Sequence, residues 1–121
     1  MHFECRHCGA RLSSELRTIH ISERNKRMGV DLLPTGTVMQ EDGSYFQARA
    51  GVFVGNAEDL FEVKLTDDSR RLAGCCGLDG CDGPNLQCER CGTYVATKRT
   101  DCWMAHCAVL EPDTTKAVPG L

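Results

Sequence analysis

The sequence lacks the features that would place the protein in or across a membrane. No apolar run approaches the roughly 18 residues of a membrane span. The N-terminal stretch MHFECRHCGARL lacks the apolar segment of a signal peptide. We therefore expect an intracellular, cytoplasmic protein, in which thiols stay reduced. Aromatic residues are scarce too, at 6% of 121 residues, so we expect a small hydrophobic core. A bound metal ion or a disulfide would help to stabilise such a fold.

An excess of charge of one sign is also missing. The 14 Lys and Arg residues nearly balance the 17 Asp and Glu residues. Nucleic-acid binders gain much of their affinity by neutralising phosphates, and the small basic clusters here, such as Arg70-Arg71 and Lys98-Arg99, are typical of solvated loops. We expect the partner to be a protein or a small molecule rather than nucleic acid or a membrane, and the chain to be a monomer.

Cysteine, in contrast, is abundant, and four of the nine cysteines lie in the two motifs CRHCG and CERCG. A C-x-x-C turn aims two sulfurs at one ion, and the glycine after it can take the positive φ with which the chain leaves the turn. Four thiolates suit tetrahedral Zn²⁺ and leave no open coordination position. The sequence therefore predicts a structural zinc site, with a disulfide pair or iron as alternatives, made by Cys5, Cys8, Cys88 and Cys91.

The distance between the two motifs has consequences for the architecture. A metal bound by both closes nearly the whole chain, and loop-closure entropy grows with loop length. Metal binding of this kind can contribute on the order of 10 kcal/mol to folding. We expect the ion to fasten two sheets at one end of a single domain over residues 1–110, followed by a flexible tail over residues 111–121. His7, inside the first motif, is expected to be exposed and not to bind the ion.

The segment between the motifs has the pattern of β-strands. Residues 59–65 alternate apolar and polar side chains, the period of a half-buried strand. Asn56 suits the cap of a short helix over residues 56–61. Further strands are predicted over residues 15–22, 37–40, 45–54, 93–98 and 102–110, with residues 37–40 as the hairpin partner of residues 45–54. The sequence thus predicts a mainly β fold of two antiparallel sheets with few or no helices.

Glycine recurs at every third position of one stretch, at Gly74, Gly77, Gly80 and Gly83. This spacing predicts consecutive tight turns in which the backbone closely approaches another group. Because the second cysteine motif follows directly, we expect a packed loop that covers the zinc end of the molecule. A binding or redox loop is the alternative.

Five cysteines lie outside the two motifs: Cys75, Cys76, Cys81, Cys102 and Cys107. Free cysteine in proteins is usually a small buried hydrophobe, so we expect Cys81, Cys102 and Cys107 to be buried and inert. The adjacent Cys75 and Cys76 are expected to face different environments, with one of them buried. A disulfide between the adjacent Cys75 and Cys76 is not expected, because it would be strained. A reactive thiol would need exposure and a nearby positive charge.

The order of motifs, FECRHCGARL followed far along the chain by NLQCERCGTYVATK, resembles the β-tent fold over about residues 3–110. Yippee proteins, the drug-binding domain of cereblon and methionine-R-sulfoxide reductases share this fold, in which zinc pins two antiparallel sheets at the apex. The resemblance implies that the four motif cysteines are the zinc ligands. The stretches GCCGLDG, DGPN and DCW also resemble a family of small bacterial proteins.

Two features of the β-tent families are missing from this chain. Yippee and cereblon-type domains carry a tryptophan just beyond the second motif, where this chain has residues 93–97, and Trp103 is its only tryptophan. The reductases carry a catalytic cysteine in an R-x-C-x-N-like setting, which DCWMAHCAVL lacks. The resemblance therefore implies the fold and the metal site more than a particular activity.

With no recognisable catalytic constellation, a binding module is favoured over an enzyme. We expect its ligand or partner to be bound by the glycine-rich loop and nearby aromatic side chains, with these residues taking part: Trp103, Tyr94, Asp79 and Asn85.

The rival interpretation is a thiol redox enzyme similar in scheme to the sulfoxide reductases. Cys102 or Cys107 would attack, and Cys75, Cys76 or Cys81 would resolve the intermediate. This interpretation predicts that two sulfurs outside the zinc site lie close together and that at least one of them is exposed.

Overall fold

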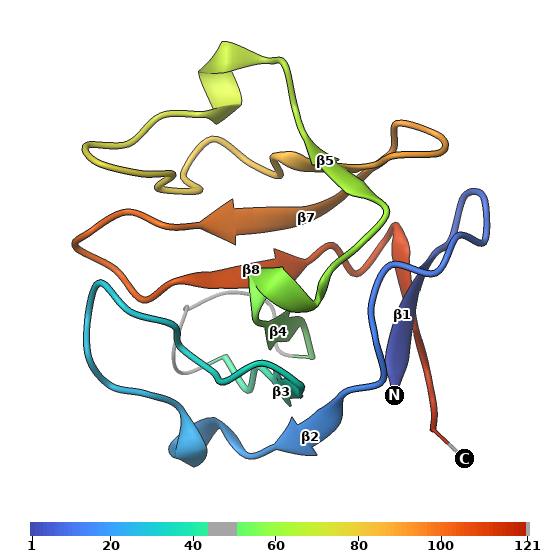
Figure 1. The fold of residues 1–121 in the computed structure, drawn as a ribbon, viewed down its shortest axis with the longest axis horizontal. Helices are drawn as coiled ribbons and strands as arrows, with labels where there is room; N and C mark the ends of the chain where they lie inside the picture. The colour runs from blue at the N-terminus through green and yellow to red at the C-terminus, as the bar shows by residue number, and fades with distance from the viewer. Residues whose placement is uncertain (44–50, 121) are drawn as a thin grey trace.

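A computed structural model describes residues 1–43 and 51–120 as two β-sheets (Figure 1). The smaller sheet pairs β1 (His2–Cys5) with β9 (Thr115–Val118), and the larger one has the strand order β2-β3-β4-β8-β7-β6-β5. Its strands are β2 (Arg17–Ile19), β3 (Thr37–Gln40), β4 (Phe53–Gly55), β5 (Val63–Leu65), β6 (Leu86–Cys88), β7 (Tyr94–Arg99) and β8 (Cys107–Leu110). The prediction of a mainly β fold with two sheets is confirmed.

Helical structure in the described residues is limited to the single 3₁₀ turns η1 (Ile21–Glu23), η2 (Ala57–Asp59) and η3 (Ser69–Arg71). The short helix predicted at Asn56 is present as η2, because the Asn56 side chain accepts a hydrogen bond from the backbone N–H of Glu58 at 2.9 Å. None of the helices in the part of the chain described here has the length and apolar character needed to cross a bilayer.

One strand pair departs from the expected antiparallel pattern. β2 and β3 run parallel, whereas the other strand pairs are antiparallel. A parallel pair needs a long connection, and residues 20–36 supply it. The predicted hairpin pairing is confirmed where it can be followed, since Met39 of β3 lies opposite Val54 of β4, and Gln40 lies opposite Phe53. Most of the predicted strand 45–54 lies outside the described residues.

The C-terminal segment, expected to be a flexible tail, is instead part of the fold. His2 pairs with Val118 and Cys5 with Thr115 in the antiparallel β1–β9 sheet. Without β9, one edge of β1 would present unpaired backbone groups, which are costly when buried. The prolines at 112 and 119 made this segment look irregular in sequence, but they flank the strand rather than interrupt it.

The core joins the two sheets. Phe3 of β1 is 1% exposed and packs in one cluster with side chains of the larger sheet, among them Val38, Leu86 and Leu110. The rings of Phe3 and Phe53 meet edge to face, with centroids 5.3 Å apart. Burying a side chain of this size stabilises a fold by roughly 1.5–3 kcal/mol, so Phe3 is the main apolar link between the sheets.

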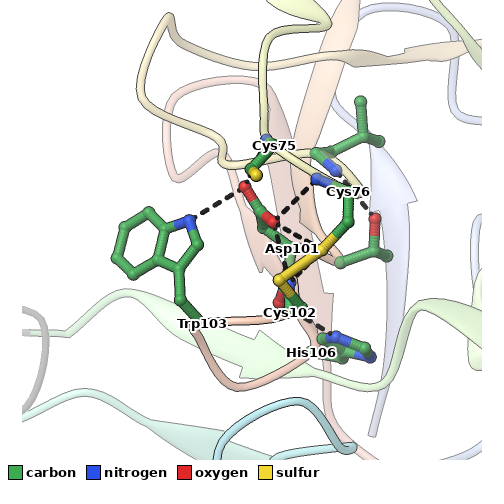
Figure 2. The surroundings of a disulfide bond; sticks show 8 residues. Cys75, Cys76, Asp101, Cys102, Trp103 and His106 are labelled. Atoms are coloured by element: carbon green, nitrogen blue, oxygen red, sulfur yellow. Dashed lines mark hydrogen bonds between the residues drawn. A yellow bond between two sulfur atoms is a disulfide. The ribbon is translucent and has the colours of Figure 1, made fainter.

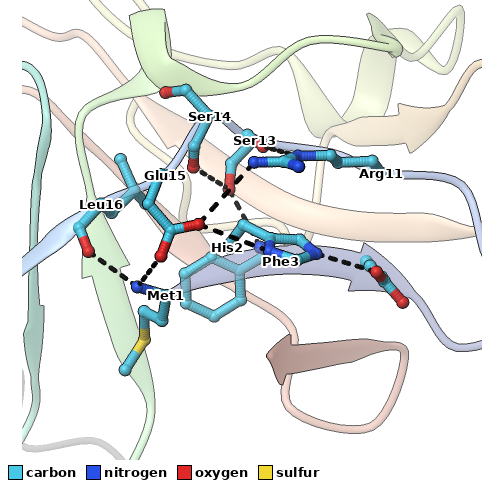
Figure 3. Close-up of polar contacts among 9 residues, drawn as sticks. Met1, His2, Phe3, Arg11, Ser13, Ser14, Glu15 and Leu16 are labelled. Carbon is cyan, nitrogen blue, oxygen red and sulfur yellow. Dashed lines mark hydrogen bonds and ion pairs between the residues drawn. The ribbon is translucent and has the colours of Figure 1, made fainter. Parts of the chain in front are cut away.

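A network of polar contacts fastens the second edge of β1 (Figure 3). The Met1 amino group forms an ion pair with Glu15 at 2.7 Å and donates to the Leu16 carbonyl at 2.9 Å. The backbone N–H of Phe3 donates to Ser13 Oγ at 2.9 Å. The hydrogen bond from the Met1 amino group lowers the pKa of Glu15. The first strand is therefore held on both sides, which fixes the position of Cys5 at its end.

Candidate metal centre and disulfide loop

The four motif cysteines form one compact cluster, called here the four-cysteine cluster. Their sulfur atoms lie within 4.8 Å of one another. The Sγ atoms of Cys5 and Cys91 are 3.6 Å apart, as are those of Cys8 and Cys88. A tetrahedral ion with Zn–S bonds of about 2.3 Å needs sulfurs separated by roughly 3.8 Å. The cluster therefore has the size and the donor set to hold a thiophilic metal ion.

Two matching turns produce this geometry. In each, the glycine N–H donates to the carbonyl of the first cysteine at 2.8 Å, from Gly9 to Cys5 and from Gly92 to Cys88. Gly9 and Gly92 have φ values of 78° and 79°, the left-handed region that glycine enters without strain. The role predicted for the trailing glycines is confirmed at both turns.

The four-cysteine cluster joins the two sheets. Cys5 ends β1 of the smaller sheet, and Cys88 ends β6 of the larger one. Both are buried against Leu12 and Val95. An ion in the cluster would therefore bind the sheets together at one edge, which agrees with the structural role predicted from the spacing.

The cysteines of the cluster differ in their surroundings. Burial raises the pKa of Cys5 and of Cys88. The hydroxyl of Thr93, followed by its backbone N–H, lowers the pKa of Cys91 to about 6. Of these three thiols, Cys91 is the one whose surroundings favour the thiolate. His7 is exposed, as predicted.

The glycine-rich loop lies at the other end of β7 from the four-cysteine cluster, not over it (Figure 1). The Leu78 carbonyl accepts the backbone N–H groups of Thr100 and Asp101 at 2.8 and 3.0 Å, and the Leu78 N–H donates to Thr100 Oγ1 at 3.0 Å. The expectation that this loop covers the metal end is therefore wrong. The loop follows η3 and docks on the end of β7 before the chain returns along β6.

Close packing explains the glycine spacing. A Cβ atom on Gly77 would lie 2.3 Å from the Thr100 carbonyl oxygen, and one on Gly80 would lie 2.8 Å from Arg99 Cγ. Neither position leaves room for a side chain, so the loop backbone can rest directly against residues 99–100. The predicted close approach is confirmed, and its partner is the end of β7.

Two of the five remaining cysteines form a disulfide between the loop and the chain beyond β7. Cys76 and Cys102 are bonded, and both are exposed. Cys75 and Cys81 are exposed free thiols. The expectation of buried, inert thiols is therefore wrong for Cys81 and Cys102, and the expectation that Cys75 and Cys76 differ in burial is wrong too, because the loop is a surface layer. The expectation of burial holds for Cys107, which is 2% exposed and whose pKa burial raises to about 12.

The carboxylate of Asp101 organises the disulfide (Figure 2). Its Oδ2 accepts the backbone N–H of Cys75 at 2.9 Å and the indole N–H of Trp103 at 2.9 Å. Its Oδ1 accepts the backbone N–H of Cys76 at 3.2 Å and that of Cys102 at 2.8 Å. These bonds, first the one from Cys75, lower the pKa of Asp101. The sequence analysis missed Asp101, although aspartate in a turn commonly binds nearby backbone N–H groups.

The structure does not bring the four predicted binding residues into one site. Tyr94 begins β7 near the four-cysteine cluster, where its hydroxyl pairs with Thr66 Oγ1 at 2.7 Å. Trp103 lies beyond the other end of β7 and is 58% exposed.

The other two residues stabilise local structure. Asn85 is fully buried, and its amide exchanges two hydrogen bonds with the backbone of Lys98, at 2.7 and 3.0 Å. Asp79 Oδ1 accepts the backbone N–H of Cys81 at 2.9 Å. Both residues therefore shape the glycine-rich loop and its exit, and Trp103 is the one predicted residue that the fold presents openly to solvent.

No protein-family model, no curated protein and no solved structure matches this chain. The case for its function therefore depends on the two sulfur sites and their surroundings.

Proposed function

We propose that the protein is a small zinc-stabilised binding module of the cytoplasm, in which the metal has a structural role. The observation that carries this proposal is the four-cysteine cluster, whose sulfurs lie within 4.8 Å of one another and belong to both sheets. Four thiolates fill a tetrahedral zinc and leave no position for a reacting water. The layout, with one cysteine motif near each end of the domain, is that of the β-tent fold, to which we assign the chain.

Trp103 is the centre of the proposed binding surface. Its indole N–H is fixed by Asp101, while 58% of the residue remains exposed. The loop that carries Met28, itself 62% exposed, is joined to this segment by the hydrogen bond from the Gly29 N–H to the Met104 carbonyl at 2.9 Å. Anchored aromatic residues and methionine are common at protein interfaces.

The shape of this surface favours a protein partner. Small-molecule sites are concave, and three surface hollows of the molecule, of about 420, 290 and 390 Å³, are lined by residues other than Trp103. An exposed indole with a fixed orientation suits insertion into a pocket on another protein.

The metal part of the proposal is tested by elemental analysis of the purified protein. We expect one zinc per chain, released by chelators only together with loss of the folded structure. The matched variants are Cys88→Ser, which should lose the metal, and Cys81→Ser, which should keep it. A metal-free folded protein, or iron in place of zinc, would overturn the assignment.

The binding part is tested by cross-linking in an extract of the source cells. We expect protein cross-links that Trp103→Ala abolishes and that Phe61→Ala, which removes another exposed aromatic side chain, leaves in place. Cross-links that persist in Trp103→Ala would remove this surface from the proposal.

A second candidate function, thiol redox chemistry, is favoured by the exposed disulfide between Cys76 and Cys102. It is the feature that a redox enzyme would need, two neighbouring sulfurs outside the metal cluster. Cys107 does not support it, because a buried thiol with a pKa near 12 is a poor nucleophile.

A further inference from the structure

We propose that Cys76 and Cys102 form a reversible exchange site that is oxidised to the disulfide and reduced by a dithiol, and that Asp101 holds the two cysteines in place through both states. This inference deepens the redox candidate and does not depend on the binding role of Trp103. Its basis is an exposed disulfide whose two chain segments are also joined by hydrogen bonds that do not involve the sulfurs.

The hydrogen bonds keep the site assembled when the disulfide opens. Asp101 bonds to the N–H groups of Cys75 and Cys76 on one segment and of Cys102 on the other. The bonds between Leu78 and Thr100 hold the same segments together a few residues away. Reduction removes one covalent bond from a loop that remains closed, so the two thiols stay near each other and can bond again.

The disulfide can be reached from solvent. Cys76, Cys102 and their neighbour Cys75 are all exposed. Disulfides that are exposed to solvent are more often labile, regulatory or catalytic. In a reducing compartment, where we expect this chain to reside, disulfides that form are usually transient or catalytic.

The reaction is thiol–disulfide exchange with a dithiol. A thiolate of the dithiol attacks one sulfur, the Cys76–Cys102 bond breaks, and the other cysteine leaves as a thiolate that takes a proton. The second thiol of the dithiol then attacks the mixed disulfide, releases the remaining cysteine and becomes oxidised with its partner sulfur. One disulfide is consumed and one is formed, with no other oxidant or reductant.

The sulfur of Cys76 has two polar neighbours. Its Sγ lies 3.1 Å from Asp101 Oδ1 and 3.1 Å from the backbone nitrogen of Cys102. The carboxylate disfavours a thiolate on Cys76, whereas the N–H of Cys102 favours one. Once reduced, Cys76 has a proton that it can donate to the carboxylate oxygen, which keeps the thiol beside Cys102.

The closed loop also favours a dithiol over a monothiol such as glutathione. After the first attack, Cys102 remains beside the mixed disulfide and can expel a monothiol by the reverse reaction. A dithiol escapes this reversal because its own second thiol completes the reduction. The class of partner is therefore a dithiol, small or carried by a protein of the thioredoxin type.

The experiment uses the zinc-loaded protein and counts accessible thiols with a maleimide that adds measurable mass. After oxidation, we expect labels on Cys75 and Cys81 only, and a peptide map with Cys76 linked to Cys102. Dithiothreitol should then expose two further thiols without releasing zinc, and oxidised dithiothreitol should restore the link. At equal thiol concentration, glutathione should reduce the pair on the order of tenfold less effectively. Thioredoxin, used in place of dithiothreitol, tests a dithiol that is carried by a protein.

Variants test whether the contact between the glycine-rich loop and Thr100 controls how easily the disulfide is reduced. Thr100→Val removes the acceptor of the Leu78 N–H, so the loop should loosen and the dithiothreitol concentration at half reduction should fall, while Cys81→Ser should leave it unchanged.

Several results would overturn the proposal. A second zinc per chain that depends on Cys76 and Cys102 would make them metal ligands. Failure to form the link on oxidation, a link from Cys75 instead, or reduction only after unfolding would also exclude the exchange site. Equal reduction by glutathione would exclude the dithiol class. None of these results changes the zinc content expected of the four-cysteine cluster, so the two proposals fail independently.

Discussion

The two ends of β7 use cysteine in opposite ways. At its start, four sulfurs converge from two tight turns, and two of them are buried between the sheets. Beyond its end, two exposed sulfurs are bonded to each other and held by one carboxylate. The difference shows that the surroundings of a cysteine, rather than cysteine content, decide its role. Convergence with burial suits a structural metal, whereas exposure to solvent suits exchange with another thiol.

Disruption of the four-cysteine cluster should have the largest effect on stability. Cys88→Ala removes one of four donors and opens a cluster that joins the sheets, and structural zinc contributes on the order of 10 kcal/mol to folding. We expect the variant to be unfolded at 25 °C, as seen by far-ultraviolet circular dichroism and by metal content. A folded, metal-free Cys88→Ala variant would show that the sheets hold together without the ion.

Loss of the disulfide end should be milder. Cys102→Ser removes a cross-link between residues 26 positions apart, which in the chain-entropy model lowers the free energy of unfolding by about 3.5 kcal/mol. The variant should remain folded with full zinc content, as measured by urea denaturation and elemental analysis. If Cys102→Ser unfolds as Cys88→Ala does, the contrast between the two ends is wrong.

The docking of the glycine-rich loop can be weakened without touching a sulfur. Gly77→Ala forces a Cβ into the Thr100 carbonyl, and overpacking of this kind costs about 1–3 kcal/mol. Gly55→Ala is the matched control, because its Cβ would meet other atoms only at 3.7 Å or more. We expect a lower Tm and easier reduction of Cys76–Cys102 in Gly77→Ala alone. The same change in both variants would mean that the loop is not pressed against β7.

The smallest effect concerns the buried thiol beside the disulfide end. Burial raises the pKa of Cys107 in the folded state from 9 to about 12. The stabilisation gained by burying the neutral thiol is therefore present below pH 9 and is lost as the pH rises towards 12. By pH 10 the wild type should lose about 1 kcal/mol of unfolding free energy that Cys107→Ala does not lose, since one pKa unit corresponds to about 1.4 kcal/mol. Parallel pH profiles in urea denaturation would contradict this.

Sequence reasoning predicted the metal end well because its signal is local. Each C-x-x-C-G motif contains the turn, the two donors and the glycine with positive φ, so spacing alone specifies the geometry. The β class and the cap at Asn56 were also predictable, from alternation and from capping chemistry.

The sequence allowed Cys76 with Cys102 as one of several pairings of neighbouring sulfurs, but it could not single out this pair, for a physical reason. The pairing of Cys76 with Cys102 depends on where the glycine-rich loop docks, which is a contact between segments that no short-range pattern encodes. The role of Asp101 could not be predicted for the same reason, because the four N–H groups that donate to its carboxylate come from two separate segments. The strand at Thr115–Val118 was missed since pairing with β1, rather than its own composition, makes it a strand.

The pairing of β1 with β9 also bears on how the protein is made. During synthesis the first strand emerges early, but its partner and the second cysteine motif come from the last third of the chain. Phe3 and the thiol of Cys5 therefore lack these partners until the second cysteine motif and β9 have been synthesised. An ion bound by all four cysteines would have to wait for the second motif, and a chain interrupted before it would present its apolar first strand to solvent and to chaperones.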